Sequence, residues 1–224
     1  MSDAFGQMLP FALVIALSPI PIVAVIAMLF SQRAIANGVA FLAGWVVGVA
    51  GGLALLSAVA EAWGLLGSDD APSTTVVVLR FLLGGLLLVA AARTWRGRPR
   101  PGDAVAMPAW MARIDGIGPF GAFGLAALLG GVNPKNLLMN VAAAAVLAAE
   151  ELSRADQAAA IALSTAVASS SVALAVGYRV FAGERGAVTL ERMRGWLAAN
   201  DATVMSVLFL VFGVKLVGDA ITGL

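Results

Sequence analysis

Two proline motifs hold the residues whose types and spacing could support chemistry in this chain. The first reads Ser-Pro-Ile-Pro at residues 18–21 and the second reads Asn-Pro-Lys-Asn at 133–136, each near the middle of a long apolar run. Proline lacks a backbone N–H and clashes with the preceding turn, so an interior proline leaves helix carbonyls without donors. Lipid cannot supply those donors, so such a break must face protein or a polar cavity. The motifs therefore predict two broken helices around a polar interior.

Lys135 supplies the charge in the second motif. It lies roughly 14 residues from either end of its predicted helix, about 20 Å along the axis, which is farther than a lysine can reach toward the membrane surface. An ionisable side chain at that depth is expensive and is therefore a candidate functional residue. It could bind an anionic headgroup or a carboxylate, could release its proton and couple transport to proton movement, or could bond the freed carbonyls structurally. The residues expected to bind a substrate or line its path are Ser18, Pro19, Pro21, Asn133, Pro134, Lys135 and Asn136.

The chain lacks residue types on which many enzymes and metalloproteins depend. It has no cysteine and no histidine, which removes disulfides, thiolate chemistry and the usual ligands of zinc and iron–sulfur centres. The membrane interior also offers no paired carboxylates and no nucleophile with its base, which an enzyme modifying a lipid would need. We therefore expect no catalytic residue, no metal and no cofactor.

The composition is that of an integral membrane protein. Of the 224 residues, 61% are hydrophobic and 12% are charged, whereas roughly a quarter are charged in an ordinary soluble domain. A membrane-spanning helix needs roughly 20 apolar residues, and uncharged runs of that order cover 4–32, 34–60, 116–134 and 157–178. The longest polar stretch, 93–115, is too short for a core of its own. We therefore expect one transmembrane domain over residues 1–224, with its first span retained rather than cleaved as a signal peptide.

The expected fold is all-α, with six transmembrane helices arranged as two inverted three-helix repeats whose first and fourth helices are broken. Three helices in each half start the second half on the opposite side of the membrane, so matching segments become inverted repeats. The first repeat covers about 1–96, a cytoplasmic linker about 97–116, and the second repeat about 117–224. A short likeness between 81–85 and 210–213 supports the repeat. The helices are predicted at about 5–30, 37–60, 74–95, 117–149, 156–181 and 202–221.

Basic residues set the expected orientation. Ten arginines fall in or beside the first, third and fifth loops, whereas the loops on the other side contain only Arg154. Positive charge favours the cytoplasmic side, so both termini should face outward from the cytoplasmic membrane. The fifth loop, 184–200, has apolar residues at helical spacing, which indicates a short helix on the membrane surface. The ten arginines are Arg33, Arg93, Arg96, Arg98, Arg100, Arg113, Arg179, Arg185, Arg192 and Arg194.

Small residues on two helices indicate close packing. Gly44, Gly48 and Gly52 recur every fourth residue and give one smooth face along which another helix can approach. The hydroxyl residues of the fifth helix could line a path, but packing is the more usual role of such residues in membranes. They are Ser164, Thr165, Ser169, Ser170 and Ser171.

The motifs also resemble a known group of transporters. A proline motif in the first of six helices and Asn-Pro-Lys at 133–135 resemble the lysine exporter superfamily, whose amino-acid exporters have a glycine between the prolines where this chain has Ile20. The likeness is closer to the GAP branch, the glycolipid-addressing or sulfolipid-1-addressing proteins typical of actinobacteria, and it extends over nearly the whole chain. It is carried by Ser-Pro-Ile-Pro-Ile at 18–22, Asn-Gly at 37–38, Phe-Leu at 41–42, Gly-Trp at 44–45 and Asn-Pro-Lys-Asn-Leu-Leu at 133–138.

That resemblance implies delivery of a glycolipid, such as a glycopeptidolipid or a sulfolipid, to the cell surface. The first hypothesis is therefore a translocator or export factor for a lipid or glycolipid, with Lys135 holding an anionic headgroup. An exporter of amino acids or similar small solutes, and a non-transporting scaffold of a lipid-export complex, are the alternatives. The expected partners are membrane lipids or the glycolipid substrate, with other lipid-export proteins and a second copy of the chain as further candidates, and no nucleic acid.

Overall fold

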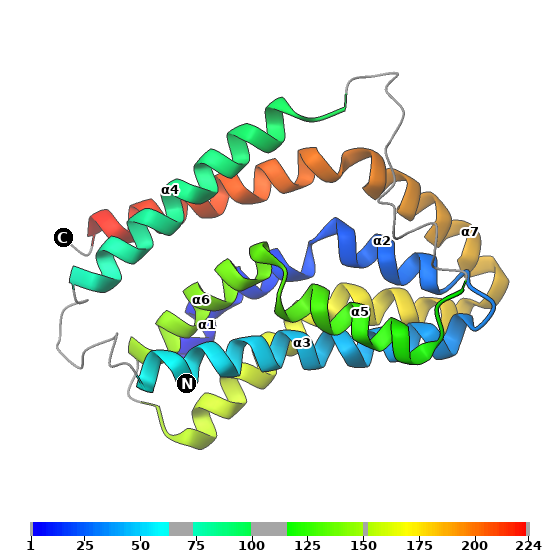
Figure 1. Ribbon diagram of the computed structural model, residues 1–224, viewed down its shortest axis with the longest axis horizontal. Coiled ribbons are helices and arrows are strands. Elements are labelled where there is room, and N and C mark those ends of the chain that lie inside the picture. The colour runs from blue at the N-terminus through cyan, green and yellow to red at the C-terminus, as the bar shows by residue number, and fades with distance from the viewer. Residues whose placement is uncertain (1, 63–73, 100–115, 150–151, 223–224) are drawn as a thin grey trace.

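The computed structural model describes residues 2–62, 74–99, 116–149 and 152–222, and every regular element within those ranges is a helix (Figure 1). The all-α prediction is confirmed for this part of the chain, and each of the six predicted helical regions is helical. The helices are α1 Ser2–Ala16, α2 Pro19–Met28, α3 Ala34–Ala62, α4 Thr74–Arg96, α5 Pro119–Gly131, α6 Pro134–Ala149 and α7 Arg154–Thr222.

Several of these helices are long and apolar enough to cross a bilayer. Within the described residues they are α3 and the two parts of α7, Arg154–Gly183 and Arg185–Thr222. The pair α1 and α2, bent by 52°, makes a fourth if it is counted as one span. Helix α5 is a shorter apolar helix. The chain is therefore a membrane protein with three to four candidate spans in its described part.

Both proline motifs coincide with interruptions between helices. Helix α1 ends at Ala16 and α2 begins at Pro19, whereas α5 ends at Gly131 and α6 begins at Pro134. In each case a proline is the first residue of the second helix. A backbone N–H at that position has no intrahelical acceptor, so the N–H that proline lacks costs no hydrogen bond. The local chemistry of proline thus places both breaks where the sequence predicts them.

The last third of the chain differs from the prediction. Residues 184–200 do not form a loop with a separate surface helix, because α7 continues through them to Thr222. Gly183, with φ 55° and ψ −136°, is the non-helical residue at which α7 bends sharply (Figure 1). A positive φ is readily adopted by glycine alone, so one residue is enough for the turn. The helical spacing predicted for 184–200 is confirmed, but the prediction of a separate short helix was wrong, because this stretch is continuous with the last span.

Glycines position the helices against one another. A Cβ atom on Gly48 of α3 would collide with the carbonyl oxygen of Ala127 on α5, and one on Gly44 would collide with that of Phe123. Helix α4 packs along the second part of α7, where a Cβ on Gly84 would lie 3.0 Å from the Gly213 oxygen and one on Gly213 would lie 3.1 Å from the Gly84 oxygen. The glycine face of α3 is therefore a packing surface, as predicted.

Hydrogen bonds between helix ends show which ends share a side of the bundle. Asn37 Nδ2 donates to the Ile117 carbonyl at 2.9 Å, which joins the start of α3 to the segment before α5. At the other end Gln157 Nε2 donates to Glu61 Oε1 at 2.7 Å. The predicted grouping of loops thus agrees with the packing, but the side that faces the cytoplasm stays a prediction. The linker residues Arg100, Pro101 and Arg113 lie outside the described residues.

Candidate functional site

The first break exposes backbone carbonyls at the end of α1. In a continuous helix the Ser18 N–H would bond to the Val14 carbonyl, but it bonds to Ile15 at 3.3 Å instead. The carbonyl of Val14 is thereby released, and Lys135 Nζ donates to it at 3.3 Å. A residue of the second motif therefore completes the first break, although 121 positions separate the two in sequence.

A second carbonyl of this break is satisfied by α7. The Ser171 hydroxyl donates to the Ala16 oxygen at 2.6 Å. Among the predicted residues of this break, Ser18, Pro19 and Pro21 are all buried, and Ser18 makes no side-chain cap to α2. The break thus lies inside the protein and is held from two sides.

The second break is completed by its own asparagines. Asn133 Oδ1 accepts the backbone N–H of Lys135 at 3.0 Å and so caps the start of α6. Asn136 Nδ2 donates to the Leu129 and Gly130 carbonyls at 2.9 and 3.4 Å. Pro134 cannot donate to Gly130, so Asn136 takes over that bond. Pro134 is exposed, whereas Asn136 is buried.

Lys135 is buried at the meeting of the two breaks, with 9% of its surface exposed. The carbonyl that it contacts belongs to the last turn of α1, where the helix dipole is negative. That end of a helix favours a cation, and it compensates part of the penalty of removing the ammonium group from water. Five of the predicted residues therefore lie at one place: Lys135, Asn133 and Asn136 by direct contact, with Ser18 and Pro19 at the facing break.

An acidic residue that the sequence did not single out faces this lysine. Asp201, on the second part of α7, lies close enough to Lys135 to interact with it electrostatically. Its side chain is partly buried, and Oδ1 has no hydrogen-bond partner among the described residues. The prediction of a loop over 184–200 had placed Asp201 outside the last helix. Continuous helix from Arg185 to Thr222 instead puts it near the middle of 38 residues.

Further buried polar groups on α6 and α7 have no hydrogen-bond partner within the described structure. Asn140 follows Asn136 by one helical turn, and its Nδ2 is buried without a partner, as are the Thr165 and Ser169 hydroxyls within the described structure. Asn140 and Ser164 line a small cavity together with Met8 and Phe11 of α1. Asn140 was also missed, because an asparagine in an alanine-rich helix carries no local signal.

The arrangement can bind a polar or charged group. A buried cation, a facing carboxylate and several open hydrogen-bonding groups suit a polar or charged group that exchanges with the protein's own pairs. No set of three or more histidine, cysteine or acidic side chains in the described ranges could hold a metal ion.

Comparison with known proteins gives one match. A family model described as Sap, sulfolipid-1-addressing protein, matches residues 8–222. Comparisons with curated proteins and with solved structures give no match. The matched region includes both breaks and all of the site residues named above.

Proposed function

The chain belongs to the Sap (sulfolipid-1-addressing protein) family, and from this membership and the site we propose that it moves a lipid or glycolipid with an anionic headgroup across the cytoplasmic membrane toward the cell surface. The observation that carries the proposal is the burial of Lys135 where the two broken helices meet. A cation at that depth is a binding group for an anion by default. The family description supplies the lipid, and the site supplies the charge that would hold its headgroup.

The pair formed by Lys135 and Asp201 indicates how the headgroup enters and leaves. An anionic headgroup competes with the Asp201 carboxylate for the same ammonium group, so Lys135 keeps a counter-ion both before and after binding. Exchange of counter-ions avoids an isolated buried charge, which would be the most expensive state of the site. In this proposal the headgroup crosses along the unpartnered polar groups of α6 and α7, while its acyl chains stay in the bilayer.

The architecture proposed with this function is six spans in two inverted repeats, as in the lysine exporter superfamily. Two observations support it. Each proposed repeat begins with a helix pair interrupted at a proline, which is the usual construction of a transporter site at the bilayer centre. Gly84 and Gly213, which the sequence likeness of 81–85 and 210–213 aligns with each other, contact each other reciprocally, as residues on a two-fold axis would. The termini then face outward.

One observation favours a second candidate, an exporter of amino acids or similar zwitterions. The ammonium group of Lys135 and the carboxylate of Asp201 face each other, so a zwitterion could pair its carboxylate with the first and its ammonium with the second. This candidate uses the same residues but carries no acyl chains. The substrate class therefore decides between the two.

The test is transport by the purified chain alone in liposomes. A fluorescent lipid with an anionic headgroup should change leaflets in vesicles containing the wild-type chain and remain in place in vesicles containing Lys135→Met. The matched control is Arg154→Gln, which removes an exposed cation outside the site and should transport normally. Movement of labelled amino acids, without movement of the lipid, would favour the second candidate. Movement of neither would point to a non-transporting scaffold.

A further inference from the structure

A second group of charged side chains lies well away from Lys135. Arg80 on α4 and Lys215 and Asp219 on α7 line a pocket whose other walls include Phe11 and Leu83. The pocket also contacts Val146 near the end of α6. Ala142 of α6 lines it as well, so the two places are separated by about 10 to 16 Å along that helix at 1.5 Å per residue. We call this place the Arg80 pocket.

The charges of the Arg80 pocket do not cancel. Lys215 Nζ and Asp219 Oδ2 form an ion pair at 2.5 Å, and each side chain is 39% exposed. Arg80 is partly buried, and its side chain forms no ion pair or hydrogen bond in the described structure. Two cations and one anion therefore leave an excess of one positive charge, and that charge is centred on Arg80. A guanidinium group in this setting is well suited to an oxyanion, because it presents parallel N–H donors.

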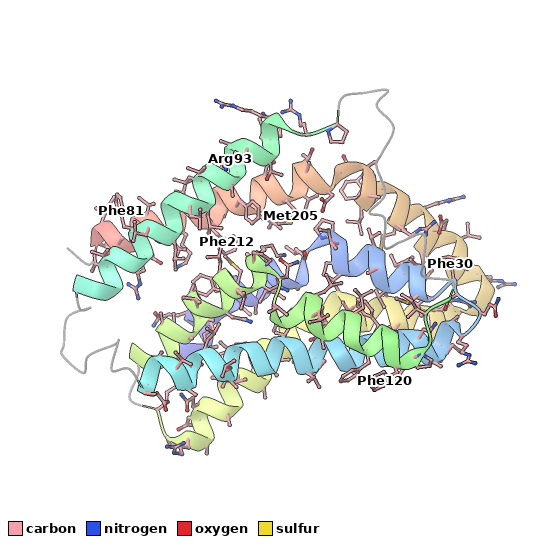
Figure 2. All side chains as sticks on the ribbon, in the orientation of Figure 1. Phe30, Phe81, Arg93, Phe120, Met205 and Phe212 are labelled. Atoms are coloured by element: carbon pink, nitrogen blue, oxygen red, sulfur yellow. The ribbon has the colours of Figure 1, made fainter. Side chains whose placement is uncertain are left out.

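The surroundings indicate that the oxyanion is attached to an apolar molecule. Phe11, which lines the pocket, and Phe212 lie with ring centroids 6.4 Å apart. Phe212 is drawn between the α4–α7 pair and the other helices (Figure 2). On the outer side of α4, Phe81 is 52% exposed next to Arg80 (Figure 2). Charged groups within an apolar surface, on helices of a membrane protein, suit a ligand with one ionic end and one hydrocarbon end.

We propose that the Arg80 pocket binds a membrane lipid through a singly charged oxyanion headgroup. Arg80 contacts the headgroup, and the acyl chains of the lipid lie along α4. Asp219 limits the affinity, because it neutralises Lys215 and repels the headgroup. Phe11 also lines the small cavity of Asn140 and Ser164, so the Arg80 pocket adjoins the polar groups that extend from Lys135. Binding here does not depend on transport, so this inference and the proposed function are tested independently.

The test measures lipid binding by the purified full chain in neutral detergent micelles. Native mass spectrometry of the complex gives apparent affinities for phosphatidylglycerol, which is a single anion, and for phosphatidylcholine, which is zwitterionic. The wild-type chain should prefer phosphatidylglycerol. Arg80→Gln should weaken phosphatidylglycerol binding roughly tenfold, about 1.4 kcal/mol, without changing phosphatidylcholine binding. Asp219→Asn should strengthen it severalfold, because the change frees Lys215 and removes the repulsion.

Three controls make the outcomes decisive. Arg93→Gln removes an exposed arginine at the other end of α4, and Arg154→Gln removes an exposed arginine at the start of α7. Both should bind phosphatidylglycerol like the wild type. Arg80→Lys keeps the charge and should retain most of the affinity, which separates loss of binding from loss of folding. Unchanged affinity in Arg80→Gln or Asp219→Asn overturns the proposal, as does an equal loss in Arg93→Gln or Arg154→Gln. Full displacement by millimolar inorganic phosphate would identify a soluble anion as the ligand and overturn the lipid assignment.

Discussion

Lys135 and Asp201 should stabilise the fold as a coupled pair, and a double-mutant cycle measures that coupling. Lys135→Met leaves the Val14 carbonyl without its donor, and an unsatisfied buried group of this kind destabilises by about 1–3 kcal/mol. The same change leaves the Asp201 carboxylate without its cation. Because Asp201 is only partly buried, this loss destabilises the fold less than breaking a fully buried ion pair would. The free energy of unfolding should therefore fall by roughly 2–4 kcal/mol.

The second single variant and the double variant complete the cycle. Asp201→Asn keeps the size of the side chain but leaves Lys135 without a counter-ion, and it should destabilise by roughly 1 kcal/mol. The double variant retains no unpaired charge at the site, so its loss should be smaller than the sum of the two single losses by about 1 kcal/mol. Unfolding of the purified chain by titration with sodium dodecyl sulfate in mixed micelles gives all four values. Additive losses, or full stability of Lys135→Met, would refute the pairing.

Three further changes test separate contacts. Ser171→Ala should destabilise by about 1–2 kcal/mol in the same unfolding assay, because it leaves the Ala16 carbonyl without a donor, whereas Ala at the exposed neighbour Ser170 should have no measurable effect. Gly48→Ala should destabilise by about 1–3 kcal/mol, because its Cβ would collide with the backbone of Ala127. The control Gly51→Ala, where nothing lies within 4 Å, should be neutral or slightly stabilising. Equal stability of the two variants would contradict the packing of α3 against α5. Lys135→Arg should retain lipid movement in liposomes only if charge alone is required, and loss of transport in a folded Lys135→Arg would show that the compact ammonium group is needed.

The features that were predictable from the sequence are those with a local physical cause. Proline removes a donor wherever it stands, so both breaks follow from Pro19 and Pro134 without knowledge of the fold. Glycine at every fourth position makes a smooth face on any helix, so the close approach along Gly48 follows as well. The burial of Lys135 follows from its distance to both helix ends. Each of these predictions requires only the chain within one helix.

The features that were not predictable depend on what the rest of the molecule does. The stretch 184–200 is helical, as its apolar spacing predicts, but it is joined to the last span because a single glycine at 183 provides the whole turn. The spacing alone does not distinguish this continuous helix from a separate short one. Asp201 faces Lys135 only because that helix is continuous. Asn140 belongs to the site only because α1 and α3 pack against α6. Tertiary packing, rather than local pattern, selects these residues.

The way in which the freed carbonyls are satisfied bears on whether Lys135 is merely structural. Ser171 satisfies the Ala16 carbonyl with a neutral hydroxyl, and Asn136 satisfies the Leu129 and Gly130 carbonyls with a neutral amide. A neutral donor would serve Val14 equally well and would avoid the penalty of a buried charge, which amounts to several kcal/mol in a membrane. The bond of Lys135 to Val14 at 3.3 Å is also longer than the 2.6 Å bond of Ser171, so hydrogen bonding alone does not explain the ammonium group. A break requires only a donor, whereas Lys135 also brings a positive charge. That charge interacts with the Asp201 carboxylate, and in the proposed function it also holds the anionic headgroup.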